Sequence, residues 1–235
     1  MRQLLAAARG DRGLVVIEGF HALKHALRFG ADVLAAGTTD PDGLAALAEE
    51  LAPDLALAGL VATVGDLGPD AHHTGVVAVA RRPPFDPDAL GPGRVVLLDA
   101  PRHPGNVGAA VRVAAAAGAA GLLVTGERDP WAPAALRGSA GLHFALPVGR
   151  VAAPPTDRPL IAVHPRAQPG DEAAGRGRWD PLATLPDDAV LAFGSERHGL
   201  GAALLARADA RVGIPMRPGV SSLNLATAVA VVLYA

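Results

Sequence analysis

Three glycine-containing segments hold polar side chains that could do chemistry at the ends of expected strands. They cover residues 99–112, 193–200 and 214–226, and each follows a short apolar run that predicts a β-strand. Ligands of open α/β sheets bind at the carboxyl ends of the strands, so we expect the three segments to meet in one cleft. The segments contain carboxylate, amide, hydroxyl, imidazole and guanidinium groups, which can position a substrate, share its proton or stabilise developing charge.

The sequence lacks the motifs of several common enzyme classes. It has no Walker A sequence and no G-x-G-x-x-G after a strand, which argues against nucleoside triphosphatases and dinucleotide enzymes. Gly194-Ser195-Glu196 is not a G-x-S-x-G elbow. Cysteine is absent, and His72, His73 and His103 lack the H-E-x-x-H spacing. We therefore expect no disulfide, no cysteine nucleophile and no metal.

Length and composition indicate a folded chain without an overall basic surplus. The 235 residues are 50% hydrophobic and 19% charged, which excludes a disordered protein and allows one large domain or two small ones. The formal net charge is −2, with −3 over residues 1–82 and +1 over residues 83–235. A nucleic-acid-binding surface would therefore have to be a local one.

No targeting or membrane segment is expected. The apolar run Leu4–Ala8 is too short for the core of a signal peptide, and the run Leu225–Ala235 is about half a membrane span. The default expectation is a soluble cytoplasmic protein.

Short apolar strands alternate with helical segments on both sides of a proline-rich seam at Arg81–Pro87. This alternation predicts α/β layers with parallel strands. Strands are expected at Leu14–Ile17, Val33–Ala36, Gly75–Ala80, Val95–Leu98, Gly121–Thr125, Leu160–Val163, Val190–Phe193 and Val212–Ile214. Helices are expected at His21–Phe29, Leu44–Leu51, Val107–Ala117 and from about Leu223 onward, and loops at Pro154–Pro159 and Gln168–Gly177.

The three segments together resemble the SpoU (TrmH-like) family of RNA ribose 2′-O-methyltransferases, which belong to the SPOUT class. The resemblance rests on three elements in order: Asn106-x-Gly108-x-x-x-Arg112, Phe193-Gly194-Ser195-Glu196-x-x-Gly199-Leu200, and Ile214-Pro215-Met216 with Ser221-Ser222-Leu223-Asn224-Leu225-Ala226. It covers residues 94–235. Residues 1–82 more loosely resemble the family's substrate-binding domain, which is similar to ribosomal protein L30e.

The resemblance implies a fold and a domain division. We expect an α/β SPOUT-type parallel sheet with a C-terminal trefoil knot, preceded by a small L30e-like α/β domain. The expected parts are an RNA substrate-binding domain at 1–82, a linker at 83–93 and a methyltransferase domain at 94–235. The implied cofactor is S-adenosyl-L-methionine, and the implied assembly is a homodimer with composite sites.

The resemblance also implies roles for individual residues. The expected catalytic residues are Arg112, Asn106, Glu196, Ser222 and Asn224. The expected cofactor-binding residues are Gly194, Ile214, Met216 and Leu223. The expected RNA-binding residues are Arg102, Arg137 and Arg197.

Simpler roles stay open for some of these residues. Asn106, Ser222 and Asn224 could cap helices, and Arg137 could be an ordinary surface arginine. Free arginine keeps its proton at ordinary pH, so Arg112 could act as a base only in a site that strongly favours the neutral form. Otherwise it would act as a cation that stabilises a developing alkoxide.

These expectations lead to one main function and two alternatives. The main function is methyl transfer from S-adenosylmethionine to a ribose 2′-hydroxyl of RNA, with rRNA favoured over tRNA. One alternative is a knotted protein that binds RNA or cofactor without transferring a methyl group. The other is a methyltransferase that acts on a small molecule.

Overall fold

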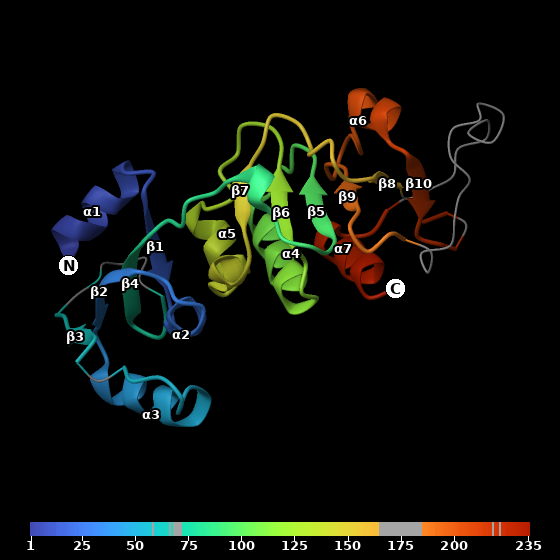
Figure 1. Cartoon of the computed structure of the whole chain (residues 1–235). Helices are drawn as coiled ribbons and strands as arrows, with labels where there is room; N and C mark the ends of the chain where they lie inside the picture. Colours follow the sequence, from blue (N-terminus) through green and yellow to red (C-terminus); the bar gives the residue numbers. More distant parts are fainter. Residues whose placement is uncertain (58, 66, 68–71, 165–184, 218, 221) are drawn as a thin grey trace.

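The structure is a computed structural model, which describes residues 1–57, 59–65, 67, 72–164, 185–217, 219–220 and 222–235. The loop expected at Gln168–Gly177 lies outside these residues. Figure 1 shows two β-sheets, one built from the N-terminal third of the chain and one from the remainder.

The first sheet is mixed and has the strand order β1-β4-β2-β3. The central strand β4 runs antiparallel to β1 and β2, whereas β2 and β3 run parallel. The strands are β1 (Leu14–Glu18), β2 (Val33–Thr38), β3 (Val61–Thr63) and β4 (Val76–Arg81).

Helices cover both faces of the first sheet because its strands bury side chains on both sides. Val15 and Ile17 of β1 belong to the core that includes Phe20 and Leu23, whereas Val16 packs with Leu5 on the other face. The helices are α1 (Arg2–Gly10) on the Val16 face, and α2 (Phe20–Arg28) and α3 (Pro41–Leu51) on the opposite face.

The second sheet is entirely parallel and has the strand order β10-β8-β9-β5-β6-β7. Its strands are β5 (Val95–Leu98), β6 (Gly121–Val124), β7 (Val148–Arg150), β8 (Leu160–His164), β9 (Val190–Phe193) and β10 (Ala210–Gly213). Each of the strands β5, β6 and β9 has four residues, and all of them are buried, as expected for inner strands that are covered on both faces.

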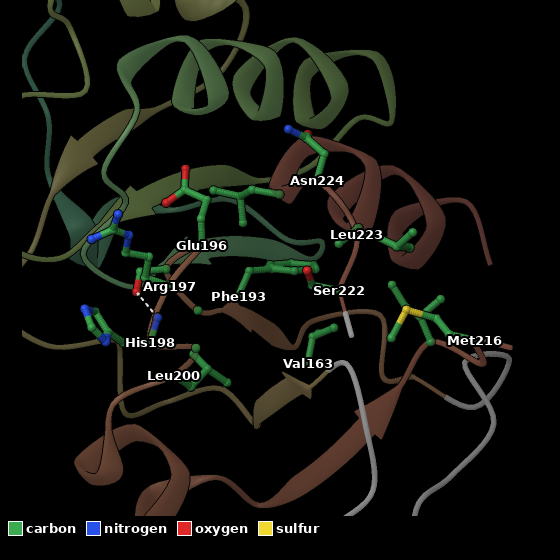
Figure 2. A pocket seen from close by; sticks show the side chains of 16 residues that line it. Val163, Phe193, Glu196, Arg197, His198, Leu200, Met216, Ser222, Leu223 and Asn224 are labelled. Carbon is green, nitrogen blue, oxygen red and sulfur yellow. Dashed lines mark hydrogen bonds between the residues drawn. The ribbon is translucent and has the colours of Figure 1, made fainter. Parts of the chain in front are cut away.

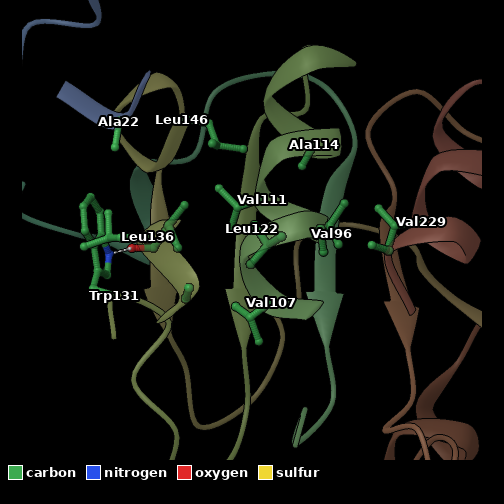
Figure 3. Packing of buried hydrophobic residues seen from close by; sticks show 14 of the residues in the cluster. Ala22, Val96, Val107, Val111, Ala114, Leu122, Trp131, Leu136, Leu146 and Val229 are labelled. Atoms are coloured by element: carbon green, nitrogen blue, oxygen red, sulfur yellow. Dashed lines mark hydrogen bonds between the residues drawn. The ribbon is translucent and has the colours of Figure 1, made fainter. Parts of the chain in front are cut away.

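Alternate residues of these strands point into two different cores. Val96 and Leu122 pack with helices on one face (Figure 3). Leu98 and Val124 pack on the same face, whereas Val95 packs on the other. The helices on the first face are α4 (Pro104–Ala116), α5 (Pro133–Gly138) and α7 (Leu225–Leu233), with α4 packed between α5 and α7. The short helix α6 (Ala202–Arg207) supplies Leu204 and Leu205 to the second face.

The segment expected to be a linker, residues 83–93, packs against that second face. The Phe85 ring occupies the space where a side chain at Gly149 would lie, and Leu90 lies in the same way over Gly121. The segment includes the 3₁₀ helix η1 (Pro87–Ala89). Arg158 donates hydrogen bonds to the carbonyl oxygens of Leu90, Gly91 and Gly93 at 2.7–3.0 Å.

The two sheets are joined by close packing as well as by the chain connection. One hydrophobic core contains residues of both, from Ile17 and Phe20 to Trp131 and Leu136. Gly141 has a φ of +80° and precedes the 3₁₀ helix η2 (Leu142–Ala145); a Cβ there would overlap the carbonyl oxygen of Ala22. The backbone of the second part therefore touches α2 directly.

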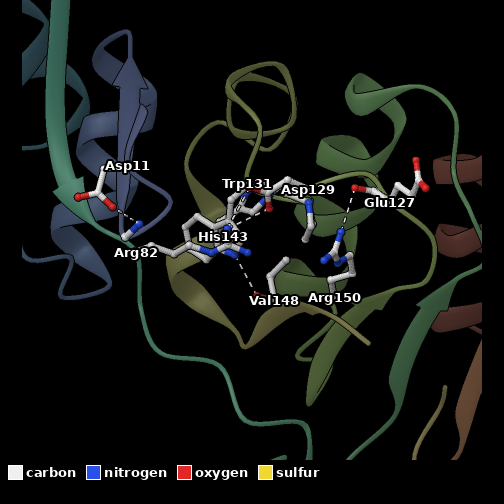
Figure 4. Close-up of polar contacts among 10 residues, drawn as sticks. Asp11, Arg82, Glu127, Asp129, Trp131, His143, Val148 and Arg150 are labelled. Atoms are coloured by element: carbon white, nitrogen blue, oxygen red, sulfur yellow. Dashed lines mark hydrogen bonds and ion pairs between the residues drawn. The ribbon is translucent and has the colours of Figure 1, made fainter. Parts of the chain in front are cut away.

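Polar contacts reinforce the same junction. Arg137 of α5 forms an ion pair with Glu18, and the Nδ1 atom of His25 lies 2.7 Å from the carbonyl oxygen of Ala140. Arg82 forms an ion pair with Asp129 at 3.0 Å and lies over the Trp131 ring (Figure 4). These contacts fix the orientation of one sheet relative to the other.

The expected fold class is confirmed, and most expected strands are present within a residue or two. The helix expected at Val107–Ala117 begins three residues earlier, and α1, α5, α6, β3 and β7 were not expected. The trefoil knot stays a prediction, because the strand order shows which strands are neighbours and not how the chain passes through its own loops. The domain boundaries also stay predictions. Across the described ranges, every helix is too short or too polar to traverse a bilayer.

Candidate active site

A cavity of about 580 Å³ opens where the loops after β9 and β10 meet the start of α7. The expected residues that line it are Gly194, Glu196, Arg197, Ile214, Met216, Ser222, Leu223 and Asn224. In Figure 2, Arg197 and His198 lie at one end of the cavity and Met216 at the other. Two of the three sequence segments therefore form its walls.

The loop after β9 is a tight turn that requires glycine. Ser195 and Gly199 exchange two backbone hydrogen bonds of 3.0 Å, and Gly199 has a φ of +65°. A Cβ at Gly194 would overlap the backbone of Gly199 and Leu200. The loop can close only around residues without side chains at these points.

Asp99, which was not among the expected site residues, connects this loop to the sheet. Its Oδ2 atom accepts a 2.7 Å hydrogen bond from the backbone N–H of Gly201, and its Oδ1 atom accepts one from the Thr125 hydroxyl, also at 2.7 Å. The carboxylate thus links the ends of β5 and β6 to the loop that forms one wall of the cavity. Its place directly after a fully apolar strand was the signal in the sequence.

Three of the expected catalytic residues form one hydrogen-bonded chain. The side-chain amide of Asn106 donates to Oε1 of Glu196 at 2.8 Å, and the side-chain amide of Asn224 donates to Oδ1 of Asn106 at 3.1 Å. The backbone N–H of Arg102 donates to Oε2 of Glu196 at 3.2 Å. The first segment, which does not line the cavity, therefore joins the site through Asn106 and Arg102.

The environment of Glu196 keeps its carboxylate ionised. Partial burial disfavours the charge, but the hydrogen bonds from Asn106 and from backbone N–H groups outweigh it and hold the pKa of Glu196 below its ordinary value. Glu196 and Asn224 are exposed, and hydrogen bonds in contact with water add little to stability. The arrangement is thus better explained by binding or catalysis than by folding.

The structure separates the capping roles that the sequence left open. Asn224 caps α7, since its Oδ1 atom accepts the backbone N–H of Ala226 at 2.9 Å. Asn106 does not cap α4, which begins at Pro104, and its side chain bonds to Glu196 and Asn224 instead.

The remaining wall of the cavity is apolar. Ile214, Met216 and Leu223 line it together with Val163 and Phe193. Phe193 is the last residue of β9, and Val163 is the last but one of β8. Val163 and Phe193 were not among the expected site residues, although they lie at the ends of strands, where ligands of α/β sheets bind.

Two expected site residues lie away from the cavity. Arg112 is on the exposed surface of α4, where its charge acts on His21 of α2, and it does not line the cavity. Arg137 is held in its ion pair with Glu18. Within one chain, the structure thus brings neither guanidinium to Glu196.

The cavity fits an organic ligand and gives no sign of a metal site. Its volume lies in the usual range of about 300–1,000 Å³ for small-molecule pockets. Apolar side chains could contact a flat ring, the backbone around Gly194 could meet polar groups, and an ionised carboxylate lies at the rim. Among the residues with described positions, no group of three His, Asp or Glu could hold a metal ion.

Comparison with known proteins places the second sheet in a known family. The model of the family described as "SpoU rRNA Methylase family" matches residues 93–234. The chain is 37% identical over 172 residues to the 23S rRNA (uridine(2479)-2′-O)-methyltransferase of Streptomyces viridochromogenes, covering 68% of this chain and 58% of that protein. It is 34% identical over 146 residues to the 23S rRNA (guanosine(2553)-2′-O)-methyltransferase RlmP of Bacillus subtilis, covering 60% and 56%.

Solved structures resemble the whole chain. The crystal structure of the SpoU methyltransferase AviRb from Streptomyces viridochromogenes, in complex with AdoMet, superposes with a TM-score of 0.75 and 28% identity. That match covers 99% of this chain and 94% of the other. The chain spans less than two thirds of the length of the two curated relatives.

Proposed function

Because this chain belongs to the SpoU rRNA methylase family, we propose that it transfers a methyl group from S-adenosylmethionine to a ribose 2′-hydroxyl of ribosomal RNA. The observation that carries the proposal is the chain of hydrogen bonds from Asn224 through Asn106 to Glu196 at the rim of the cavity. Two relatives named as 23S rRNA 2′-O-methyltransferases support the substrate class.

The cavity has the residues that S-adenosylmethionine would need. Ile214 and Leu223 would contact the adenine ring, Gly194 would leave room for the adenosine, and Met216 would pack beside it. The crystal structure of AviRb in complex with AdoMet supports the choice of cofactor. When bound, the cofactor supplies an electrophilic methyl group on a sulfonium.

The chain's own residues would orient the ribose 2′-hydroxyl and stabilise the charge that develops on its oxygen. Glu196 holds Asn106, and Asn106 holds Asn224, so the three side chains present a fixed polar surface beside the cavity. Ser222 lies in the same wall and would contact the acceptor ribose. Arg112 would stabilise the developing alkoxide as a cation, since guanidinium gives up its proton only with great difficulty.

Within its own chain Arg112 does not line the cavity, so it would take that role from another chain. We therefore include a homodimer in the proposal, with Arg112 of one copy beside the cavity of the second. Exposed apolar side chains along α7 and the adjoining loop support a second copy there: Val220, Leu223, Val231 and Tyr234 are each 38–66% exposed.

The parts of the chain would have different roles in catalysis and RNA binding. We propose residues 94–235 as the transferase, residues 1–82 as an RNA-binding part and residues 83–93 as the connection. Arg102 and Arg197, both exposed beside Glu196, would contact phosphate near the target nucleotide.

Labelled methyl incorporation tests the proposal. Purified protein, labelled S-adenosylmethionine and unmodified 23S rRNA should give labelled RNA, and mass spectrometry should map the label to a ribose. Arg112→Ala should abolish incorporation while leaving cofactor binding unchanged. Binding of RNA and cofactor without incorporation would favour the non-catalytic alternative, and methylation of a small molecule without RNA affinity would favour the other.

Mixing two impaired variants tests the composite site. Chains with Arg112→Ala should be inactive, and chains with Asn224→Ala should keep about 1% of the wild-type activity. After mixing, heterodimers should contain one intact site, and about a quarter of the wild-type activity should return if the subunits exchange freely. No recovery despite proven subunit exchange would show that Arg112 acts within its own chain or not at all.

A further inference from the structure

An unfavourable backbone conformation lies between the end of β5 and the residue that holds Glu196. Ala100 is exposed and has a φ of +45°, in the left-handed region that favours glycine. This conformation costs an alanine free energy, because its Cβ comes close to the following carbonyl oxygen. Such a residue persists where surrounding contacts impose its conformation, and residues of this kind gather at functional sites. The contacts of the bend at residues 99–102 therefore indicate what the conformation is for.

The bend has two backbone donors after Asp99, and both are bonded to side chains. The N–H of Ala100 donates to the Oγ1 atom of Thr125 at 3.0 Å. Pro101 has no N–H, so the next donor is that of Arg102, which bonds to Oε2 of Glu196 at 3.2 Å. Proline also fixes its own φ, so few torsions can change between the two N–H groups. The direction of the first donor thus limits the direction of the second.

Both ends of this short path are anchored to the sheet. The N–H of Asp99 donates to the carbonyl oxygen of Phe193 at 2.8 Å, which continues the pairing of β5 with β9. The N–H of Thr125 donates to the carbonyl oxygen of Leu98 at 3.0 Å, which places its side chain beside the bend. Pro101 is buried. The bend can therefore change direction mainly at Ala100.

The hydroxyl of Thr125 has a single proton, and its two partners decide how that proton is used. A backbone N–H can only donate, so Oγ1 must accept from Ala100. The hydroxyl proton is then left for Oδ1 of Asp99, which lies 2.7 Å away. One hydroxyl thus joins the residues that follow β5 and β6 and fixes the bend between them.

Stability alone explains these contacts poorly. Ala100, Arg102 and Glu196 are exposed, and hydrogen bonds in contact with water add little to stability. A left-handed alanine lowers stability. What the bend provides is a second donor for Glu196, in addition to the side-chain amide of Asn106.

We propose that Thr125 is a positioning residue for methyl transfer: its hydroxyl holds the bend at Ala100 so that the N–H of Arg102 meets Glu196. This inference rests on the proposed function and extends it to a residue that does not line the cavity. The contact between Asp99 and Gly201 holds the same loop from its other end.

The ionisation of Glu196 should respond to this contact. Partial burial raises the pKa of Glu196, but hydrogen bonds from Asn106 and from the backbone N–H groups of Glu196 and Arg102, together with the charge of His103, bring it below its ordinary value. Loss of the Arg102 bond should raise this pKa, so that the carboxylate takes up its proton at a higher pH. Substitution of Thr125 leaves the charged and titratable side chains around the loop in place, which are those of Asp99, Arg102, His103, Arg197 and His198.

The test follows the carbon-13 NMR signal of the Glu196 carboxyl through a pH titration of the free protein. The signal is assigned by its absence from Glu196→Gln. Thr125→Val keeps the shape of the side chain and removes the hydroxyl, so the titration midpoint should move to higher pH. Thr125→Ser keeps the hydroxyl and should titrate as the wild type does.

Two further variants separate other causes. Thr74→Val is a matched control, because its Oγ1 atom also accepts a backbone N–H, that of Phe20 at 3.2 Å, but beside the first sheet. It should leave the titration of Glu196 unchanged. Pro101→Ala keeps the hydroxyl of Thr125 and releases the bend. It should move the midpoint in the same direction as Thr125→Val, while the cofactor affinity measured by calorimetry stays that of the wild type.

Methyl transfer gives a second readout. With 23S rRNA as substrate, kcat should fall about 10-fold in Thr125→Val and recover in Thr125→Ser, because a small displacement of a group near the reaction slows it. An unchanged midpoint in folded Thr125→Val and Pro101→Ala would overturn the inference, as would a shifted midpoint with an unchanged kcat. The expected midpoints in a protein that does not methylate RNA would instead count against the proposed function alone.

Discussion

At the scale of single residues, Glu196 and Asn106 decide how the polar side of the site is arranged. Glu196 accepts hydrogen bonds from the backbone of Arg102 and the side chain of Asn106. The side chain of Asn106 in turn accepts a hydrogen bond from Asn224. Three segments that are distant in sequence are thereby joined through one carboxamide. The sequence indicated these residues, but their partners depend on where α4 begins, which the sequence placed three residues too late.

Replacing Asn106 with alanine should therefore lower kcat more than it raises KM for the cofactor. The cavity walls stay in place, but Glu196 and Asn224 lose their common partner, and a displaced group near the reaction can reduce the rate by about 100-fold. Steady-state kinetics with the RNA substrate measure both constants. A rise in the cofactor KM with an unchanged kcat would contradict this assignment.

The same substitution should shift the acid side of the pH–activity profile. Asn106 helps to keep the pKa of Glu196 low, so its removal raises that pKa and moves the loss of activity to higher pH. Asn224→Ala leaves the bond between Asn106 and Glu196 intact and should not cause this shift. The comparison of the two profiles separates loss of charge from loss of geometry.

His143 gives a prediction about stability. It is buried beside Trp131, its Nδ1 atom lies 2.7 Å from the Ser139 hydroxyl, and burial lowers the pKa of His143 to about 4. An unfolded chain binds this proton below about pH 6.5, whereas the folded chain does not until about pH 4. Stability should fall as the pH drops through this window, by about 3 kcal/mol from this residue.

Urea unfolding at several pH values checks this effect. The wild type should lose stability between about pH 6.5 and about pH 4, and His143→Gln should be less stable at neutral pH but lose less on acidification. Parallel curves for the two proteins would show that His143 is not the group responsible.

At the scale of elements, the loop between β9 and α6 forms one wall of the cavity and is held by Asp99. Asp99→Ala should raise KM for the cofactor about 10-fold or more with a smaller effect on kcat, because the wall loses its tie to β5 and β6. Asp99→Asn, which keeps one acceptor oxygen, should be milder. Calorimetry of cofactor binding gives a readout that does not depend on RNA.

Thr125→Val is the matched control for that prediction. It removes the hydroxyl that donates to Oδ1 of Asp99 and leaves the bond to Gly201 intact. Its cofactor affinity should lie between those of the wild type and Asp99→Ala. Equal affinities in all three proteins would show that the tie does not position the loop.

The elements themselves were predictable to different degrees for physical reasons. Buried parallel strands are continuous apolar runs, and β5, β8 and β9 were expected at almost the observed limits. The helices α5 and α6 have six residues each, which is too short for a helical repeat of apolar positions to show. Strand β3 has three residues and pairs only at the edge of its sheet.

At the scale of the whole molecule, the contact between the two sheets is the feature that the sequence did not indicate. The proline-rich seam suggests a free connection, yet residues 83–93 pack on the second sheet and one core runs through both parts. Proline and glycine show where regular structure ends, but they do not show whether the irregular segment is docked.

Gly141→Ala should reveal how much that contact contributes to stability. A Cβ would overlap the carbonyl oxygen of Ala22, and the φ of +80° is unfavourable for alanine. Gly118→Ala is a control with a similar φ of +69° and no atom within 4 Å of the added Cβ. Gly118→Ala should cost about 1 kcal/mol in unfolding free energy, and Gly141→Ala clearly more. Equal losses would show that the backbone contact at Ala22 is unimportant.

Direct contact between Gly141 and Ala22 also leaves little freedom for hinge motion between the two parts. If the N-terminal part holds an RNA strand, the span from that strand to Arg112 of the same chain is then a constant of the protein. The modified nucleotide would be chosen by its distance from a recognised structural feature of the RNA, as with a ruler, more than by the identity of its base.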